Sequence, residues 1–306
     1  MSEQQTMNEQ PAIRAGLPWG PADDEIQPEI RWRVTWQMFC ANKGAVIGLV
    51  LLSLIILMGL IGPMVYSGDP FAIVAQPFLE PGGEIPLGTD YIGRDILIGI
   101  VYGAKPTLAI ALSATFVTAM VGLTVGALAG FFGGKVDGFL MGVTEFFQVL
   151  PSLIFAMVVV AVFTPSLLTV VVAIGVTSWT SIARLTRAEF LKLREREFVM
   201  GARAVGARDR TIIVKVILPN ALPPLIIAIT LQIGLCILFE AALSFLGLGD
   251  PDVLTWGMMI GQSRDFFFQA WWTVSFPGLV ILLTVLSIAL IGDGLNDAYN
   301  PKLRGR

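Results

Sequence analysis

Two carboxylates of this chain, Glu145 and Glu240, lie inside long apolar segments. Glu145 is followed by Gln148, and Glu240 is flanked by Phe239 and Ala241. A carboxylate in such a setting is costly unless another group pairs with it, so it marks either a contact between helices or a polar pathway. We favour a structural contact for Glu145. For Glu240, pairing with a neighbouring helix and lining or gating a pathway are equally open.

Other residues suited to recognition lie in a polar, arginine-rich segment. Its centre reads Met200-Gly201-Ala202-Arg203-Ala204-Val205-Gly206, and Val216-Ile217-Leu218-Pro219 follows. We expect Ala202, Arg203 and Gly206 to share one face of a helix. Small residues let a short helix seat deeply in a groove on another protein, and arginine offers bidentate contacts to carboxylates. An ordinary basic loop is the alternative, but it does not predict this spacing.

Histidine and the usual catalytic signatures are missing from the sequence. The chain has no histidine, which removes histidine-based acid–base catalysis, Ser-His-Asp sets and most transition-metal sites. It has no Gly-x4-Gly-Lys-Ser/Thr phosphate loop, and its two cysteines, Cys40 and Cys236, give no disulfide framework. We therefore expect a non-catalytic protein without a metal or cofactor of its own.

The elements that position these residues are predicted to be membrane-spanning helices. Hydrophobic residues make up 55% of the 306 residues and charged residues 14%, with a mean hydropathy of +0.76, whereas soluble domains are about 25% charged. Six apolar runs lack the alternation of a barrel, so we predict an all-α membrane protein with six transmembrane helices. The predicted spans are 44–65, 107–132, 139–163, 166–182, 222–246 and 273–291. The first run begins too far along the chain for a secretory signal and is interpreted as an uncleaved span.

Lysine and arginine residues gather on one side of this arrangement. The segment 183–221 is strongly basic and both tails carry further Lys and Arg residues, whereas the opposite side keeps only Arg94, Lys105 and Arg264. The positive-inside rule then places both termini and the basic segment in the cytoplasm. The predicted organisation is a cytoplasmic tail, 1–43, with an interfacial helix at about 30–41, a transmembrane domain, 44–295, and a cytoplasmic tail, 296–306. Within the transmembrane domain, loops 66–102 and 247–272 are extracytoplasmic and loop 183–221 is cytoplasmic.

Four glycines recur at every fourth position around the second predicted span: Gly122, Gly126, Gly130 and Gly134. Such a stripe lets another helix approach backbone to backbone. Static packing is the simpler interpretation. A smooth surface along which neighbouring helices shift is the alternative.

Several motifs, in the same order along the chain, resemble one family of transport proteins. The predicted outer loop contains Leu87-Gly88-Thr89-Asp90-Tyr91-Ile92-Gly93-Arg94-Asp95, which resembles the LGTD-x-x-GRD signature of C-type permeases of dipeptide, oligopeptide and nickel importers. The likeness continues through 150–153, 218–226, 240–249, 256–257, 276–278 and 292–297.

The arginine-rich segment resembles the cytoplasmic EAA signature of ABC importer permeases. Met200 stands at the Glu position of that signature and Gly201 at its first Ala, while Ala202 and Gly206 match. Val216 replaces the usual Ile, and Glu197 lies just upstream.

The resemblance implies the type I ABC importer permease fold and a permease subunit of an ATP-driven importer in a bacterial inner membrane. The implied partners are a B-type permease that completes a heterodimer, two cytoplasmic ATPase subunits that carry ATP and Mg²⁺, an extracytoplasmic substrate-binding protein and the lipid bilayer, with no nucleic acid. The residues implied to couple the chain to an ATPase are Glu197, Met200, Gly201, Ala202, Arg203, Gly206, Leu218 and Pro219. Those of the extracytoplasmic motif are Gly88, Asp90, Gly93, Arg94 and Asp95.

The resemblance makes di- and oligopeptides the expected substrates. Nickel chelates, glutathione, opines and oligosaccharides are carried by similar importers and stay open. A secondary transporter driven by an ion gradient is the alternative of a different class. Such a protein is expected to show internal inverted repeats and broken midplane helices, and no repeat is visible in this sequence.

Overall fold

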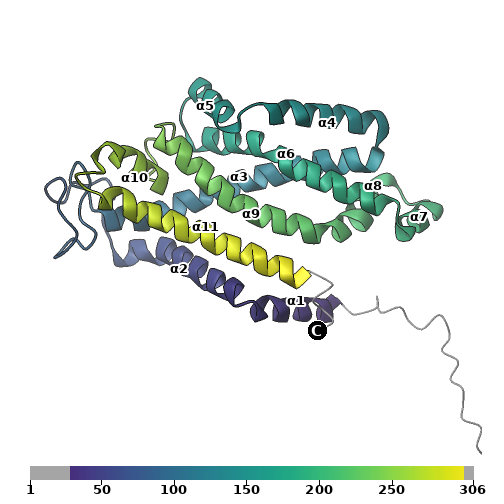
Figure 1. Cartoon of the computed structure of the whole chain (residues 1–306), viewed down its shortest axis with the longest axis horizontal. Coiled ribbons are helices and arrows are strands. Elements are labelled where there is room, and N and C mark those ends of the chain that lie inside the picture. Colours follow the sequence, from purple (N-terminus) through teal and green to yellow (C-terminus); the bar gives the residue numbers. More distant parts are fainter. Residues whose placement is uncertain (1–27, 300–306) are drawn as a thin grey trace, which may run out of the picture.

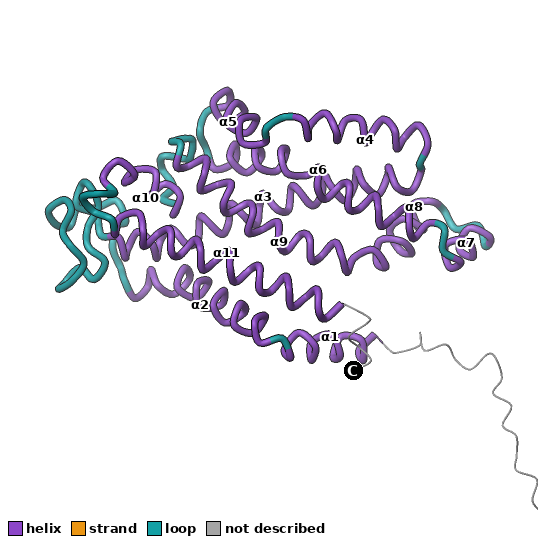
Figure 2. The backbone as a smooth tube through the Cα atoms, viewed as in Figure 1, coloured by secondary structure: helices purple, strands orange, loops and turns teal. Residues whose placement is uncertain are grey.

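The apolar runs of the sequence form long helices that lie side by side (Figure 1). In the computed structural model, which describes residues 28–299, five helices are long and apolar enough to cross a membrane. They are α2 (Lys43–Val65), α3 (Ile96–Phe132), α6 (Leu167–Arg194), the helix Asp209–Phe245 that contains α9 (Leu218–Phe245), and α11 (Trp272–Tyr299). The shorter helices are α1 (Pro28–Ala41), α4 (Gly134–Val149), α5 (Ser152–Phe163), α7 (Glu197–Ala204), α8 (Asp209–Thr211) and α10 (Trp256–Ser263). The described residues form no strand (Figure 2), which confirms the all-α prediction.

The third predicted span, 139–163, is not one straight helix, and the prediction is wrong on this point. α4 ends at Val149 and α5 begins at Ser152, and the two helices are bent by 87°. Pro151 explains the break, because the residue before a proline is forced out of the helical region. Leu150 accordingly has extended angles, with φ −73° and ψ 129°. Counted as one crossing, the bent pair brings the number of candidate spans to six.

Three further spans extend beyond their predicted limits. α3 begins at Ile96 rather than at Thr107, α6 continues past Ile182 to Arg194, and α11 continues past Ile291 to Tyr299. The apolar run marks only the part of a helix that suits lipid, whereas backbone hydrogen bonds continue the helix into polar surroundings. The predicted loops 66–102 and 183–221 are correspondingly shorter in the structure.

The fifth crossing begins before Pro219, contrary to the sequence prediction. Its helix begins at Asp209, and the segment Ile212–Ile217 just before α9 is π-helical. The wider turn of a π-helix gives the ring of Pro219 room against the carbonyl groups of the preceding turn. Asn220 Nδ2 also donates to the carbonyl of Val216 at 2.7 Å. The chain therefore passes from the basic segment into the fifth span without leaving helical geometry.

Figure 1 shows α7, α1 and the end of α11 at one end of the bundle, and α10 with the long loop before α3 at the other. This arrangement agrees with the prediction that the basic segment and both tails share a side. Which side faces the cytoplasm stays a prediction. The outermost parts of the predicted tails, 1–27 and 300–306, and the side chains of 28–34 lie outside the described residues.

α3 and α6 pack closely because glycines separate them. A Cβ on Gly122 would lie 2.7 Å from Cβ of Ile182, and one on Gly130 would lie 2.6 Å from Cβ of Phe190. A Cβ on Gly126 would collide with the carbonyl of Ala183. Three members of the predicted glycine stripe thus lie where two backbones meet.

Gly134 does not belong to this stripe, and its assignment to the second span is wrong. α3 ends at Phe132, and Gly134 begins α4 with φ +53°. No atom lies within 4 Å of a Cβ placed there. The regular spacing of four continues past the point where the helix ends, so spacing alone does not reveal the turn.

Candidate functional site

α7 and the turn after it expose an apolar surface at one end of the bundle. Val199 is fully buried against the chain, whereas Phe198 is 45%, Met200 53% and Val205 85% exposed. Gly201 is also exposed and lies on the side of the helix opposite Val199. We call Phe198, Met200, Gly201 and Val205 the α7 outer face. Exposed apolar side chains gathered in this way make the α7 outer face a candidate docking surface.

The predicted binding face, Ala202 with Gly206, is wrong in its geometry. α7 ends at Ala204, and Gly206 lies beyond it with φ +78°. The Gly206 N–H donates to the Arg203 carbonyl at 2.9 Å and the Ala207 N–H donates to the Ala202 carbonyl at 3.1 Å. This pair of bonds is a Schellman motif, in which glycine supplies the left-handed residue that ends a helix. Ala202 packs against the chain's own core rather than facing outward.

Of the remaining residues predicted for coupling, Arg203 and Leu218 attach α7 to the bundle. Arg203 stacks its guanidinium 5.4 Å from the ring centroid of Phe131, at the end of α3. Leu218 packs on the apolar cluster beneath α7, and Pro219 follows it in the first turn of α9. Glu197 is exposed in the first turn of α7, where its negative charge interacts favourably with the helix dipole.

A cavity of about 670 Å³ opens where α4 and α5 meet, against α6 and α9. The cavity is lined by residues from both sides of the Pro151 break, by one face of α6 and by the middle of α9. Its polar lining consists of hydroxyl and amide side chains: Gln148, Ser152, Thr177, Ser178, Thr180, Ser181 and Gln232. None of the side chains that line this cavity is charged. A hollow of this kind can hydrogen-bond a polar solute without selecting it by charge.

The sequence did not predict this cavity, because charged residues within apolar segments were the only signal used for a pathway. The signal left unused is the group Thr177, Ser178, Thr180 and Ser181, four hydroxyl residues near the end of the apolar first half of α6. Glu145 and Glu240 are not among the residues that line the cavity. Glu145 is exposed on α4.

Glu240 lies inside α9, where it is only 1% exposed, and its carboxyl group accepts hydrogen bonds from two hydroxyl groups. Its Oε1 accepts hydrogen bonds from Ser244 at 2.7 Å and from Thr255 at 2.8 Å, while Oε2 has no partner among the described residues. Thr255 is the residue that caps α10. Of the two roles left open by the sequence, this geometry supports the contact between helices, and a gating role stays a prediction.

Comparison with known proteins matches these elements to one family. The profile of the binding-protein-dependent transport system inner membrane component matches residues 122–305, and that of the N-terminal TM domain of oligopeptide transport permease C matches residues 31–81. The chain belongs to this family of transport permeases. The first match covers more than half of the chain, including α7, the cavity and Glu240.

Curated relatives agree with this assignment along most of the permease. It is 40% identical over 277 residues to the di/tripeptide transport system permease protein DppC of Pseudomonas aeruginosa, covering 88% of this chain and 91% of the relative. It is also 40% identical to the dipeptide transport system permease protein DppC of Escherichia coli K12, covering 88% and 92%. The predicted resemblance to ABC importer permeases of the peptide type is therefore confirmed.

A solved structure shares the fold of the permease. A chain of the MetNI methionine ABC transporter superposes with a TM-score of 0.56 at 23% identity, covering 66% of this chain and 97% of that one. At this level of identity, the similarity concerns the helical fold alone. A broken helix such as α4–α5 also occurs in secondary transporters, but the family match places this chain among the ABC importer permeases.

The LGTD-x-x-GRD motif of the permease builds the loop before α3. Asp90 Oδ1 accepts hydrogen bonds from the backbone N–H groups of Ile92 and Arg94 at 2.9 and 2.8 Å. Asp95 Oδ1 caps α3 by accepting a hydrogen bond from the N–H of Leu97 at 2.7 Å. Gly88 and Gly93 take φ values of +76° and +94°, which side chains rarely adopt. The five predicted residues therefore come together in one ordered loop. Its hydrogen bonds account for Asp90 and Asp95, whereas the Arg94 side chain lies 5.2 Å from the ring centroid of Phe71 and its buried Nε has no hydrogen-bond partner among the described residues.

Proposed function

We propose that this permease forms one wall of a pathway for di- and oligopeptides. The observation that carries the proposal is the cavity at the α4–α5 break. Hydroxyl and amide groups can bond the peptide groups that all such substrates share, and the apolar part of the wall tolerates varied side chains. The names of the relatives at 40% identity, which refer to dipeptide and di/tripeptide transport, support the same substrate class.

The opposite wall comes from a B-type permease, and an extracytoplasmic binding protein delivers the peptide. In a membrane, the uncharged but polar face around the break is unsuited to lipid, which supports a second protein on that side. Much of the selectivity then lies with the binding protein, because this wall carries no charge to discriminate between peptides.

The α7 outer face docks on one of two cytoplasmic ATPase subunits. These subunits bind ATP and Mg²⁺, since this chain lacks a phosphate-binding loop. As the ATPases close and separate, they move α7, and α6 and α9 follow because they flank it in the chain. The cavity thereby opens alternately to the two sides of the bacterial inner membrane.

Reconstitution tests this function directly. The permease is co-purified with its B-type partner, its ATPases and its binding protein, and uptake of radiolabelled Ala-Ala into proteoliposomes is measured. We expect uptake to require ATP and to be competed by di- and tripeptides. Uptake driven by an ion gradient without ATP, or uptake of a nickel chelate or of glutathione but not of peptides, would overturn the proposal.

Topology is tested by cysteine labelling. Single cysteines replace Gly82, Asp252 and Arg208 in a background without Cys40 and Cys236, and intact cells or spheroplasts receive an impermeant thiol reagent. Positions 82 and 252 should label from outside, and position 208 only after lysis. Labelling of position 208 from outside would reverse the proposed orientation.

A further inference from the structure

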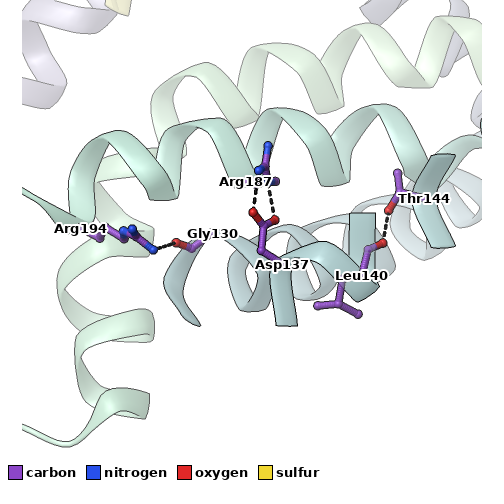
Figure 3. A network of polar contacts seen from close by, with 6 residues as sticks. All are labelled: Gly130, Asp137, Leu140, Thr144, Arg187 and Arg194. Atoms are coloured by element: carbon purple, nitrogen blue, oxygen red, sulfur yellow. Dashed lines mark hydrogen bonds and ion pairs between the residues drawn. The ribbon is translucent and has the colours of Figure 1, made fainter. Parts of the chain in front are cut away.

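An ion pair joins α4 to α6 close to the corner between α3 and α4 (Figure 3). Arg187 donates from Nε to Oδ1 of Asp137 at 2.5 Å and from Nη2 to Oδ2 at 2.6 Å. Seven residues further along α6, Arg194 Nη1 donates to the carbonyl of Gly130 at 3.3 Å. Residues seven apart lie on one face of a helix. One face of α6 therefore contacts the corner twice, through Arg187 to Asp137 and through Arg194 to Gly130.

The geometry of the pair favours a rigid contact. Both guanidinium–carboxylate bonds are made in parallel, which fixes orientation as well as distance. The Arg187 and Asp137 side chains are 35% and 17% exposed, so the pair is partly withdrawn from solvent. By contrast, the neighbouring pair of Lys192 and Glu189 is formed at 3.7 Å, and its lysine side chain is 63% exposed.

α4 has few other attachments. Thr144 is its one buried residue, and its hydroxyl bonds within α4 to the carbonyl of Leu140. Near the other end of α4, Phe147 packs edge-on against Trp179 of α6, with ring centroids 5.7 Å apart. α4 is therefore held to α6 near both of its ends, by the ion pair and by this aromatic contact.

The two helices that the pair joins lead to the two functional regions of the chain. α6 ends at Arg194, and α7 begins at Glu197. α4 ends at Val149, directly before the break that lines the cavity. α6 itself lines one side of the cavity, so a displacement of α7 that moves α6 would reach that side directly. Through the ion pair the same displacement would also reach α4 and the residues at the break.

We propose that Asp137 and Arg187 transmit the movement of α7 to the cavity at the α4–α5 break. They are positioning residues, which contact neither substrate nor nucleotide. The proposal rests on the proposed function, because it assumes that α7 receives movement from an ATPase. It adds a route within this chain by which that movement reaches the cavity wall.

The test uses the reconstituted importer and measures peptide uptake per ATP hydrolysed. Asp137→Asn and Arg187→Gln remove the charge pair, Arg187→Lys keeps the charge but not the parallel bonds, and Asp137→Arg with Arg187→Asp exchanges the partners. Lys192→Gln, on the same helix, is the control. We expect the single variants to keep ATPase association and ATP hydrolysis. Uptake per ATP should fall by about 2- to 30-fold, the range expected when a residue that carries coupling between two sites is replaced. The exchanged pair restores the attraction between the two positions but places like charges near Glu145 and Arg194, so it should recover only a small part of the loss. Lys192→Gln should match the wild type.

Unchanged uptake per ATP in Asp137→Asn, Arg187→Gln and Arg187→Lys would overturn the proposal. So would a loss of uptake in Arg187→Lys that only follows a loss of assembled complex, because that indicates a purely structural pair. Arg187→Lys keeps the test decisive if the neutral variants do not assemble. Failure of the proposed function is distinguishable, since in that case the wild-type complex itself shows no ATP-dependent peptide uptake.

Discussion

Thr255 donates its hydroxyl hydrogen to Glu240, with Oγ1 and Oε1 2.8 Å apart, and thereby fastens the start of α10 to the interior of α9. The same hydroxyl oxygen accepts the N–H of Met258 at 3.2 Å, which caps α10. Ser244 donates a second bond to the same carboxylate oxygen at 2.7 Å. The buried carboxylate therefore acts as a joint between two helices at the end of the bundle opposite α7.

Replacing Glu240 tests this joint. Glu240→Gln keeps an oxygen that accepts from Ser244 and Thr255, so stability and uptake should stay close to the wild type. Glu240→Ala removes both bonds, each worth about 0.6 kcal/mol within a membrane. The Glu240→Ala protein should still assemble, but its free energy of unfolding should fall by about 1 kcal/mol, and it should lose more uptake than Glu240→Gln. Thermal unfolding in detergent and peptide uptake check both variants. Wild-type behaviour of Glu240→Ala in both measurements would leave the residue without either proposed role.

Gly201 gives the clearest test of the α7 outer face. A Cβ at this position meets no atom within 4 Å, so Gly201→Trp adds an indole to the surface without disturbing the fold. The indole should hold an ATPase subunit away from α7, and separation by an ångström already removes much of the dispersion attraction. We expect at least a tenfold loss of ATPase co-purification and of uptake.

Gly201→Ala is the matched control, because it changes the helix surface very little and should keep both activities. Gly206→Trp is a poorer probe than its spacing suggests, since the φ of +78° strains any side chain there. If Gly201→Trp binds the ATPases as the wild type does, the α7 outer face is not the docking surface.

Gly126 tests the close packing of α3 on α6. A Cβ there would lie 2.6 Å from Cβ of Thr186 and would also collide with the Ala183 carbonyl. Gly126→Ala should lower stability by about 1–3 kcal/mol through overpacking, measured by thermal unfolding in detergent. Gly138→Ala in α4, where a Cβ meets no atom within 4 Å, is the control and should be neutral or slightly stabilising. Equal melting temperatures for the two variants would show that the helices can separate to admit a methyl group.

Gly93 tests the loop built by the LGTD-x-x-GRD motif. Its φ is +94°, and a Cβ would collide with the carbonyl of Ala75. Gly83 also has a positive φ, +60°, but a Cβ there meets no atom within 4 Å. Gly83→Ala should therefore cost about 1–2 kcal/mol, the penalty of the left-handed conformation, and Gly93→Ala should cost more. Protease resistance of the loop provides the comparison, and a Gly83→Ala loop cut as readily as a Gly93→Ala loop would mean that the collision adds nothing.

The helices themselves could be predicted from the sequence, because apolar runs of this length have few alternatives in a bilayer. Their ends could not, since an apolar run stops where lipid stops and the α6 helix continues to Arg194. The motif residues were found by their spacing, but spacing did not distinguish a helix face from a helix end at Gly206. The same limitation applied at Gly134, where the period of four continues across a turn.

The cavity and the ion pair depend on contacts between distant segments, which spacing does not encode. Arg187 and Asp137 lie fifty positions apart in the chain. Ser178 and Gln232 gain a shared role only when α6 and α9 lie side by side. A sequence offers no local signal for either arrangement, apart from the unusual group of hydroxyl residues on α6.

The break at Pro151 has a consequence for how the protein is made. α4 and α5, of 16 and 12 residues, are about 24 and 18 Å long, so neither crosses the roughly 30 Å hydrocarbon layer unaided. During synthesis α4 and α5 should leave the translocon late and only together with α6, because Phe147 of α4 packs against Trp179 of α6. A subunit made without its partner then leaves the polar side chains at the break facing lipid, and we expect membrane proteases to degrade it. Pulse-chase measurement of this chain expressed alone should show rapid turnover, which expression of the B-type permease should prevent.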